Sequence, residues 1–268
     1  VRNKAGPDFP VLCRLSADEY VDGGLKIDAS KEIAKALENN GANAPHISAC
    51  EPASGYLKQT AYYAEEGVFV HLAQEIKSVV GIPVITVGRI GTPELANRIL
   101  EEKKADLVSM GRALIADPEL PAKALYGRME EIIPCISCNR CIQSIRKGAL
   151  ACAVNPETGR EGIFKLEKTD RPKKIWIIGG GPAGMKTAEI ASFRGHQVTL
   201  YEKKERLGGR FLLAAIPPKE QILNDLIDQL ERQLQKFPVK VAIGKPFTLA
   251  SLRRGKPDAV IIATGAKS

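Results

Sequence analysis

The sequence predicts an α/β protein in two parts with a cysteine-rich segment between them. Before residue 131, apolar runs typical of buried strands alternate four times with helical patterns, as in parallel βα units. After residue 171, a short apolar strand leads through a glycine-rich turn into a helix. Between these two parts, four of the six cysteines stand close together.

The first part contains four strand–helix pairs. Each predicted strand is a short apolar run, and each predicted helix has apolar residues that recur every three or four positions. Thr92, directly before Pro93, is expected to cap the third helix, because threonine oxygens accept hydrogen bonds at helix N-termini. The predicted strands are 10–15, 44–49, 83–90 and 106–111, and the predicted helices are 29–40, 68–80, 93–103 and 118–126.

Two of these strands end in a Gly-Arg pair, Gly88-Arg89 and Gly111-Arg112. The carboxyl ends of barrel strands carry the site, and the last loops often hold a phosphate. Glycine lets the backbone approach an anion, and arginine adds a bidentate charge. The pairs therefore predict a phosphate cradle, and the alternative is two surface turns with solvent-exposed arginines. Arg14, also expected at a strand end, either faces an anionic ring or forms a salt bridge at the rim.

A complete barrel of this type needs eight βα units and about 250 residues. Only four units precede the cysteines, so either the first half of a barrel is absent or a smaller sheet forms. Half a barrel leaves open sheet edges and an uncovered interior. Because the chain begins at Val1 and stops soon after an apolar strand, we expect both ends to be cuts in a longer polypeptide.

The stretch 50–67 is long for a βα loop, and such loops often shape a site. Its polar side chains include Glu51, Tyr56, Tyr62 and Tyr63, but no histidine. His46 is expected to face a packed interior, with cofactor contact as the alternative. The remaining cysteines, Cys13 and Cys50, are expected to be small buried hydrophobes.

The cysteine-rich segment reads C-x2-C-x2-C, with a fourth cysteine after ten more residues. Thiolates suit a four-iron cluster, and two residues between ligands let one tight loop aim several sulfurs at one point. The alternatives are a structural zinc site, which more often has two separated C-x2-C pairs, and free or disulfide-bonded cysteines. The predicted ligands are Cys135, Cys138, Cys141 and Cys152.

The second part carries a complete dinucleotide fingerprint. Strand 175–178 runs into Gly179-x-Gly181-x-x-Gly184, a helix follows, and a second strand, 197–201, ends at the acid Glu202. The glycines allow a tight turn and a close approach of the pyrophosphate, and the acid would bond the ribose. The alternative is a fold of this type with an empty pocket. The residues expected at an ADP-containing cofactor are Gly179, Gly181, Pro182, Ala183, Gly184, Glu202 and Arg210.

Gly208-Gly209-Arg210 after the acid is commoner in flavin domains than in plain NAD domains. A helix over 219–236 and strands over 239–243 and 259–263 complete the predicted elements.

The charge and the amino-acid composition argue against some classes of partner and location. The net charge of +8 is spread along the chain, aromatic residues make up 5%, and nucleic acid is therefore a poor partner. No apolar run approaches the ~20 residues that span a bilayer, and we expect no signal peptide. Clustered cysteines without a secretion signal then indicate the reducing environment of the cytoplasm. We expect a small-molecule substrate, and homo-oligomerisation is left open.

The motifs VGRI, MGRAL, ADPEL, PCISCNRC…CAVNP and IIGGGPAG, in that order, resemble the multidomain Old Yellow Enzyme group. Its members include 2,4-dienoyl-CoA reductases, enoate reductases, NADH oxidases and trimethylamine dehydrogenase. The resemblance covers nearly the whole chain. It implies the C-terminal half of a TIM barrel that binds FMN at 1–130, a [4Fe–4S] segment at 131–165, and a partial Rossmann-like FAD/NAD(P)-binding domain at 172–268.

The resemblance implies that NAD(P)H reduces FAD, that the cluster passes single electrons, and that FMN delivers hydride to an activated C=C bond of an enoate, enone or dienoyl substrate. By position, Arg14 would face the FMN ring, and the two Gly-Arg pairs would hold its phosphate. Amine oxidation of the trimethylamine dehydrogenase type is one alternative, and an electron-transfer or structural module without turnover is another.

Two departures from this group matter. Dienoyl-CoA reductases usually have three residues between the second and third cysteines, where this chain has two. They also use a histidine in the loop after the strand of His46, and that loop lacks histidine here, so the sequence assigns no proton donor. We expect the chain alone to turn over poorly.

Overall fold

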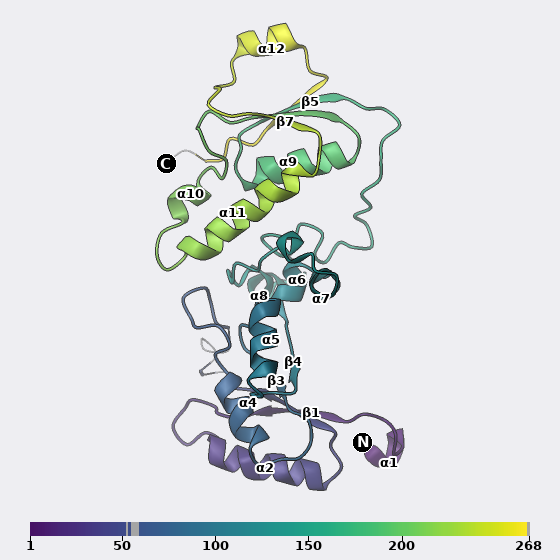
Figure 1. The fold of residues 1–268 in the computed structure, drawn as a ribbon, viewed down its shortest axis with the longest axis vertical. Coiled ribbons are helices and arrows are strands. Elements are labelled where there is room, and N and C mark those ends of the chain that lie inside the picture. The colour runs from purple at the N-terminus through teal and green to yellow at the C-terminus, as the bar shows by residue number, and fades with distance from the viewer. Residues whose placement is uncertain (52, 55–58, 267–268) are drawn as a thin grey trace. The chain divides into compact units, whose positions relative to one another are not determined.

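The computed structural model describes residues 1–51, 53–54 and 59–266 (Figure 1). The chain divides into two units, each described here by itself. The first comprises residues 1–121 and 137–156, and the second comprises 122–136 and 157–268. Cys135 therefore belongs to the second unit, whereas Cys138, Cys141 and Cys152 belong to the first. Tyr56 lies outside the described residues.

The sheet of the first unit has four parallel strands in the order β1-β2-β3-β4. The strands are β1 (Leu12–Ser16), β2 (Ala44–Ser48), β3 (Ile85–Thr86) and β4 (Leu107–Val108). The last two are shorter than predicted. After β3, the chain enters positive φ at Gly88 (129°) and Arg89 (47°), a conformation that cannot continue an extended strand.

Among the residues that the structure describes, the helices before residue 150 are α1 (Arg2–Ala5), α2 (Ile27–Asn39), α4 (Val70–Lys77), α5 (Pro93–Glu101), α6 (Arg112–Ala116), α7 (Leu120–Leu125), the 3₁₀-helix η1 (Met129–Glu131) and α8 (Arg140–Ile145). Thr92 caps α5 as predicted, because its Oγ1 accepts a hydrogen bond from Leu95 N at 3.2 Å. The short helices α6 and α8 were not predicted.

The two faces of the first sheet differ. One face packs against α2 and α4, and its buried residues include Leu15, Ile47 and Val84. On the other face, Arg14, His46 and Ile85 stand in register on neighbouring strands. Leu12 is 59% exposed and Leu107 is 50% exposed at its margins. This face of the sheet is therefore open in the described part of the chain.

The second unit has another parallel sheet, in the order β7-β6-β5-β8. Its strands are β5 (Lys174–Ile178), β6 (Gln197–Tyr201), β7 (Val239–Ala242) and β8 (Ala259–Ile262). Its helices are α9 (Pro182–Phe193), α10 (Phe211–Ala214), α11 (Glu220–Gln235) and α12 (Leu249–Gly255). In Figure 1, α9 and α11 lie on one side of the sheet and α12 on the other. This strand order is that of a Rossmann half, so the predicted α/β class with parallel sheets is confirmed.

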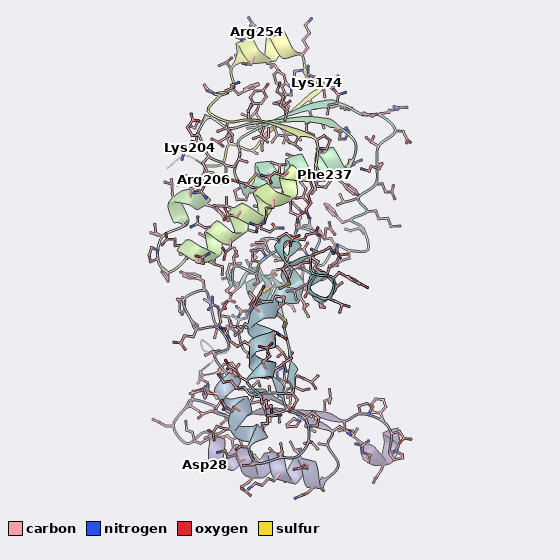
Figure 2. The ribbon with its side chains drawn as sticks, viewed as in Figure 1. Asp28, Lys174, Lys204, Arg206, Phe237 and Arg254 are labelled. Atoms are coloured by element: carbon pink, nitrogen blue, oxygen red, sulfur yellow. The ribbon has the colours of Figure 1, made fainter. Side chains whose placement is uncertain are left out.

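The exposed basic residues of the second unit come from separate elements. Figure 2 labels Lys174 on β5, Lys204 and Arg206 after β6, and Arg254 on α12. Among the described residues, no helix combines the length and the apolar character needed to cross a membrane.

Candidate functional site

The two predicted Gly-Arg pairs follow β3 and β4, but their glycines have different surroundings. At Gly88, φ is 129° and an added Cβ would lie 2.9 Å from the Phe69 ring, so only glycine fits. At Gly111, no described atom lies within 4 Å of the position that a Cβ would take. The backbone at Gly111 is therefore open to the approach of an anion.

Both arginine side chains bond to the loop after β2. Arg112 donates to the carbonyl of Thr60 at 2.5 Å and to its hydroxyl at 3.0 Å. Arg89 donates to the carbonyls of Ala64 and Tyr62. The two arginines are half-buried, so the alternative of solvent-exposed arginines on surface turns does not describe them.

The same guanidinium groups reach the cysteine segment. Arg112 Nη1 donates to Asn139 Oδ1 at 2.6 Å, and Arg89 Nε donates to Ser137 Oγ at 3.4 Å. These bonds use three of the five N–H groups that each guanidinium carries. The remaining N–H groups of both guanidinium groups can still donate hydrogen bonds to an anion. The phosphate-binding role predicted for the two arginines therefore stays a prediction.

Arg14 lies in the middle of β1, not at its end, because pairing with β2 continues to Ser16. Its Nη1 lies 3.3 Å from His46 Nε2. Burial, and then the charge of Arg14, lower the pKa of His46, so the imidazole is mainly neutral at pH 7. His46 is half-buried beside Arg14, and the expectation of a packed interior for it was wrong.

Two tyrosines of the long loop lie in its described part. The rings of Tyr62 and Tyr63 meet edge to face with centroids 5.5 Å apart, and Tyr63 is 66% exposed. Tyr20, in the loop after β1, was missed by sequence reasoning because no motif surrounds it. Its hydroxyl lies 3.5 Å from His71 Nε2, and burial, followed by the charge of Asp18, raises its pKa.

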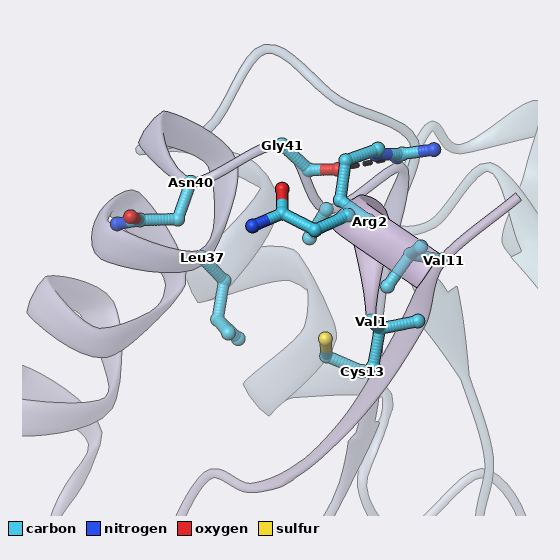
Figure 3. A pocket seen from close by; sticks show the side chains of 9 residues that line it. Val1, Arg2, Val11, Cys13, Leu37, Asn40 and Gly41 are labelled. Carbon is cyan, nitrogen blue, oxygen red and sulfur yellow. Dashed lines mark hydrogen bonds between the residues drawn. The ribbon is translucent and has the colours of Figure 1, made fainter. Parts of the chain in front are cut away.

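The described pocket in Figure 3 lies elsewhere in the first unit. It has a volume of about 220 Å³ and is lined by residues that include Arg2, Val11, Cys13 and Gly41. Val11 and Gly41 precede β1 and β2, so this pocket lies at the amino ends of the strands. Sites in parallel βα folds lie at the carboxyl ends, and the pocket is therefore separate from the candidate site.

The cysteine segment of the first unit has an internal tie. Ser144 Oγ donates to the carbonyl of Cys141 at 3.0 Å and accepts from Ala151 N at 2.9 Å. This buried hydroxyl holds the stretch before Cys152 against the stretch of Cys141. Sequence reasoning missed Ser144, because a lone serine inside a cysteine spacing carries no recognisable signal.

The cysteines form no disulfide bonds, and the thiol of Cys141 is influenced by two of the others. All six cysteines lack disulfides, so the disulfide alternative does not hold. Burial raises the pKa of Cys141, and the charges of Cys152 and Cys138 raise it further, against the lowering effect of Arg112. Cys50 is buried as predicted, whereas Cys13 is only half-buried.

The four cysteines are suitable ligands for a metal cluster by their chemistry, but the arrangement of their side chains is less suitable. Four thiols at this spacing are appropriate ligands for iron and sulfide. Across residues 1–51, 53–54 and 59–266, however, no three His, Cys, Asp or Glu side chains are gathered so that they could hold a metal ion. The ligand roles predicted from the sequence therefore stay predictions.

The glycine turn of the second unit is built as the fingerprint requires. Gly179 has a φ of 113°, and its Cβ would lie 2.4 Å from the carbonyl oxygen of Ala263. A Cβ on Gly184 would lie 1.8 Å from the Gly179 oxygen, so α9 packs directly on the turn. At Gly181, the nearest atom would be Gly209 Cα at 3.9 Å. The space in front of α9 is thus open, and Pro182 and Ala183 begin that helix.

Glu202 follows β6, as predicted, but its carboxylate also holds the glycine turn. Its Oε2 accepts from Gly180 N at 2.7 Å, and its Oε1 accepts from Lys204 N at 2.9 Å. Gly208 N donates to the Gly180 carbonyl at 2.8 Å, so the second glycine pair lies against the first. Arg210 donates to the carbonyl of Ala266 at 2.7 Å.

Comparison with protein families gives two matches. Residues 1–131 match the model of the NADH:flavin oxidoreductase / NADH oxidase family. Residues 177–221 match an NAD(P)-binding Rossmann-like domain, which covers the end of β5 and the whole of α9, β6 and α10.

Similar proteins match the whole chain but are longer. An NADH oxidase of Thermoanaerobacter brockii is 44% identical, over 100% of this chain and 42% of its own length. An N,N-dimethylglycine/sarcosine dehydrogenase of Chromohalobacter salexigens is 35% identical, over 99% of this chain and 40% of its own length. A solved 2-naphthoyl-CoA reductase in complex with 2-naphthoyl-CoA superposes with a TM-score of 0.91 at 30% identity, over 99% of this chain and 41% of that one.

Proposed function

The chain belongs to the NADH:flavin oxidoreductase / NADH oxidase family, and we propose on that premise that it is part of an enzyme that uses NAD(P)H to reduce an activated C=C bond. The substrate would be an enoate, an enone or a dienoyl thioester. The similar 2-naphthoyl-CoA reductase, whose named ligand is a CoA thioester, supports the thioester member of this substrate class. The chain spans about two fifths of the length of the relatives it matches, so this activity is proposed for the whole protein.

The observation that carries the proposal is the pair of arginines at the ends of β3 and β4, beside an open glycine. Bound FMN would supply hydride transfer. Gly88, Arg89, Gly111 and Arg112 would hold its phosphate through backbone N–H groups and the remaining guanidinium N–H groups. Arg14 would face the ring from the open side of the sheet, which we take to be the interior of a half TIM barrel.

The second unit would bind the adenosine diphosphate part of FAD. The pyrophosphate would lie before α9, where Gly181 leaves space and the helix N-terminus stabilises negative charge. Glu202, already bonded to two backbone N–H groups, keeps further lone pairs for ribose hydroxyls. NAD(P)H would act at this unit.

The four cysteines of the segment 135–152 are the proposed ligands of a [4Fe–4S] cluster, which would carry single electrons when bound. Zinc remains the alternative metal. The six cysteines form no disulfide bonds, which supports a reducing compartment, and we propose the cytoplasm. The proton donor is not assigned.

The test is anaerobic spectroscopy on the purified chain with added FAD and FMN. We expect NADH or NADPH to bleach the flavin absorbance, and an enone to restore it slowly. Iron and sulfide analysis of the same sample decides between the cluster and zinc. Lack of bleaching with either nicotinamide would overturn the proposal.

A second candidate is amine oxidation, which the similar N,N-dimethylglycine/sarcosine dehydrogenase supports. The two candidates differ in the source of electrons. Under amine oxidation, an N-methylated amine bleaches the flavin without any nicotinamide. A chain that binds flavin but responds to neither donor would instead be an electron-transfer or structural module.

A further inference from the structure

The long loop after β2 and the cysteine segment are distant in sequence, yet both bond to the same two arginines. Thr60 and Asn139 share the guanidinium of Arg112, and they lie 52 and 27 residues from it. Arg89 contacts the same two segments at nearby residues, Tyr62 and Ser137. All of these residues belong to the first unit.

Asn139 makes the direct connection between the two segments. Its Oδ1 accepts from Arg112 at 2.6 Å, and its Nδ2 donates to the carbonyl of Gln59 at 2.6 Å. Its backbone is left-handed, with a φ of 59°, a conformation that asparagine tolerates better than most residues. One side chain therefore bonds both to the loop and to the arginine that holds the loop.

A further contact fixes the other end of the cysteine segment. Asn155 Nδ2 donates to the carbonyl of Ile115 in α6 at 3.0 Å. Because α6 begins at Arg112, the segment is held to this short helix at both ends. A segment anchored in this way cannot shift without disturbing the loop that shares its arginine.

We propose that Asn139 is a positioning residue that latches residues 59–64 of the long loop to the cysteine segment through Arg112, so that order in either segment stabilises the other. This coupling goes beyond the proposed reaction and does not depend on a bound cofactor. Its consequence for an enzyme is that the loop beside the strand ends and the cysteines are held in place together.

The test is amide hydrogen exchange on the full chain, followed in peptides that cover 59–67 and 137–145. Asn139→Gly keeps the left-handed backbone and removes both side-chain hydrogen bonds. We expect exchange to become about tenfold faster or more in both peptides, because bonds to a charged group are lost. Lys103→Gly is the matched control, since Lys103 is also left-handed (φ 55°) and exposed, but stands outside the latch.

Asn139→Asp separates the two bonds. The carboxylate still accepts from Arg112 but cannot donate to Gln59, so the 59–67 peptide should exchange faster, and the 137–145 peptide, which keeps its bond to Arg112, should follow by a smaller factor. Unchanged exchange at 59–67 in the Gly variant, with faster exchange only at 137–145, would overturn the proposal. If the Gly variant fails to fold, the Asp variant decides: unchanged exchange at 59–67 would again overturn the latch, and faster exchange there would support it. Because no cofactor is added, failure of the latch is distinct from failure of the proposed reaction.

Discussion

The two units build their candidate anion sites from different parts of the chain. In the second unit, the site is mainly backbone, formed by the turn at Gly179 and the start of α9, and the side-chain carboxylate of Glu202 braces the turn. In the first unit, it depends on Arg89 and Arg112, whose side chains bond to a loop and a segment far away in sequence. A site made of backbone groups therefore depends on a few consecutive residues. A site made of side chains from distant parts of the sequence forms only when the whole unit has folded.

The largest expected effect tests how tightly the backbone site is built. Gly184→Ala places a Cβ 1.8 Å from the oxygen of Gly179, and we expect it to destabilise the second unit by ~3 kcal/mol or more. Urea unfolding followed by the fluorescence of Trp176, the single tryptophan, measures this. Gly181→Ala is the control, since its Cβ meets nothing nearer than 3.9 Å. Equal losses in the two variants would contradict the proposed packing.

The same comparison can be made in the first unit. Gly88→Ala combines a φ of 129° with a contact of 2.9 Å to Phe69, and we expect a loss of about 2–3 kcal/mol. Gly111→Ala has open space and an ordinary φ of −91°, so stability should hardly change. Thermal unfolding by circular dichroism compares the two variants. Weaker FMN binding by Gly111→Ala, seen in flavin fluorescence, would locate the phosphate there.

A smaller effect is expected at two helix caps, one in each unit. Thr92→Ala removes the acceptor for Leu95 N on α5, which buries Leu95 and Ile99, and should cost about 1 kcal/mol. Thr248→Ala removes the equivalent bond to Ser251 N on α12, which buries none of its residues. We expect the second variant to lose less global stability, because α12 can fray by itself. Similar shifts in the unfolding midpoints would show that α12 belongs to the cooperative core.

The smallest effect concerns pH. The pKa of His46 is lowered by burial and by Arg14, so the unfolded chain binds a proton at a higher pH than the folded one. The contribution of this residue to stability is therefore present above pH 6.5 and is lost as the pH falls through 6.5 towards the lowered pKa. His46→Asn should weaken the dependence of the urea midpoint on pH between 7 and about 5. If the urea midpoint of this variant changes with pH as much as that of the original chain, other titratable groups cause the dependence.

Local patterns predicted the second unit better than the first. Strand 197–201 was located at its observed bounds, because a strand, a turn and an acid are consecutive there. β3 and β4 were both predicted too long. For β3, the pattern of apolar residues does not reveal that Gly88 and Arg89 leave the extended conformation. The bonds of Arg112 to Thr60 and Asn139 were not predictable, because no spacing in the sequence relates residues 60, 112 and 139.

The hydroxyl of Ser144 has a consequence for how this protein can vary. This hydroxyl joins the stretch of Cys141 to that of Cys152. The intervening residues 145–149 form an exposed loop, which therefore does not set the distance between the two thiols. Extra residues inserted beside Gly148 would lengthen this loop and leave both sulfur atoms in place. The number of residues between the third and fourth cysteines can therefore change without altering the contact between their two stretches.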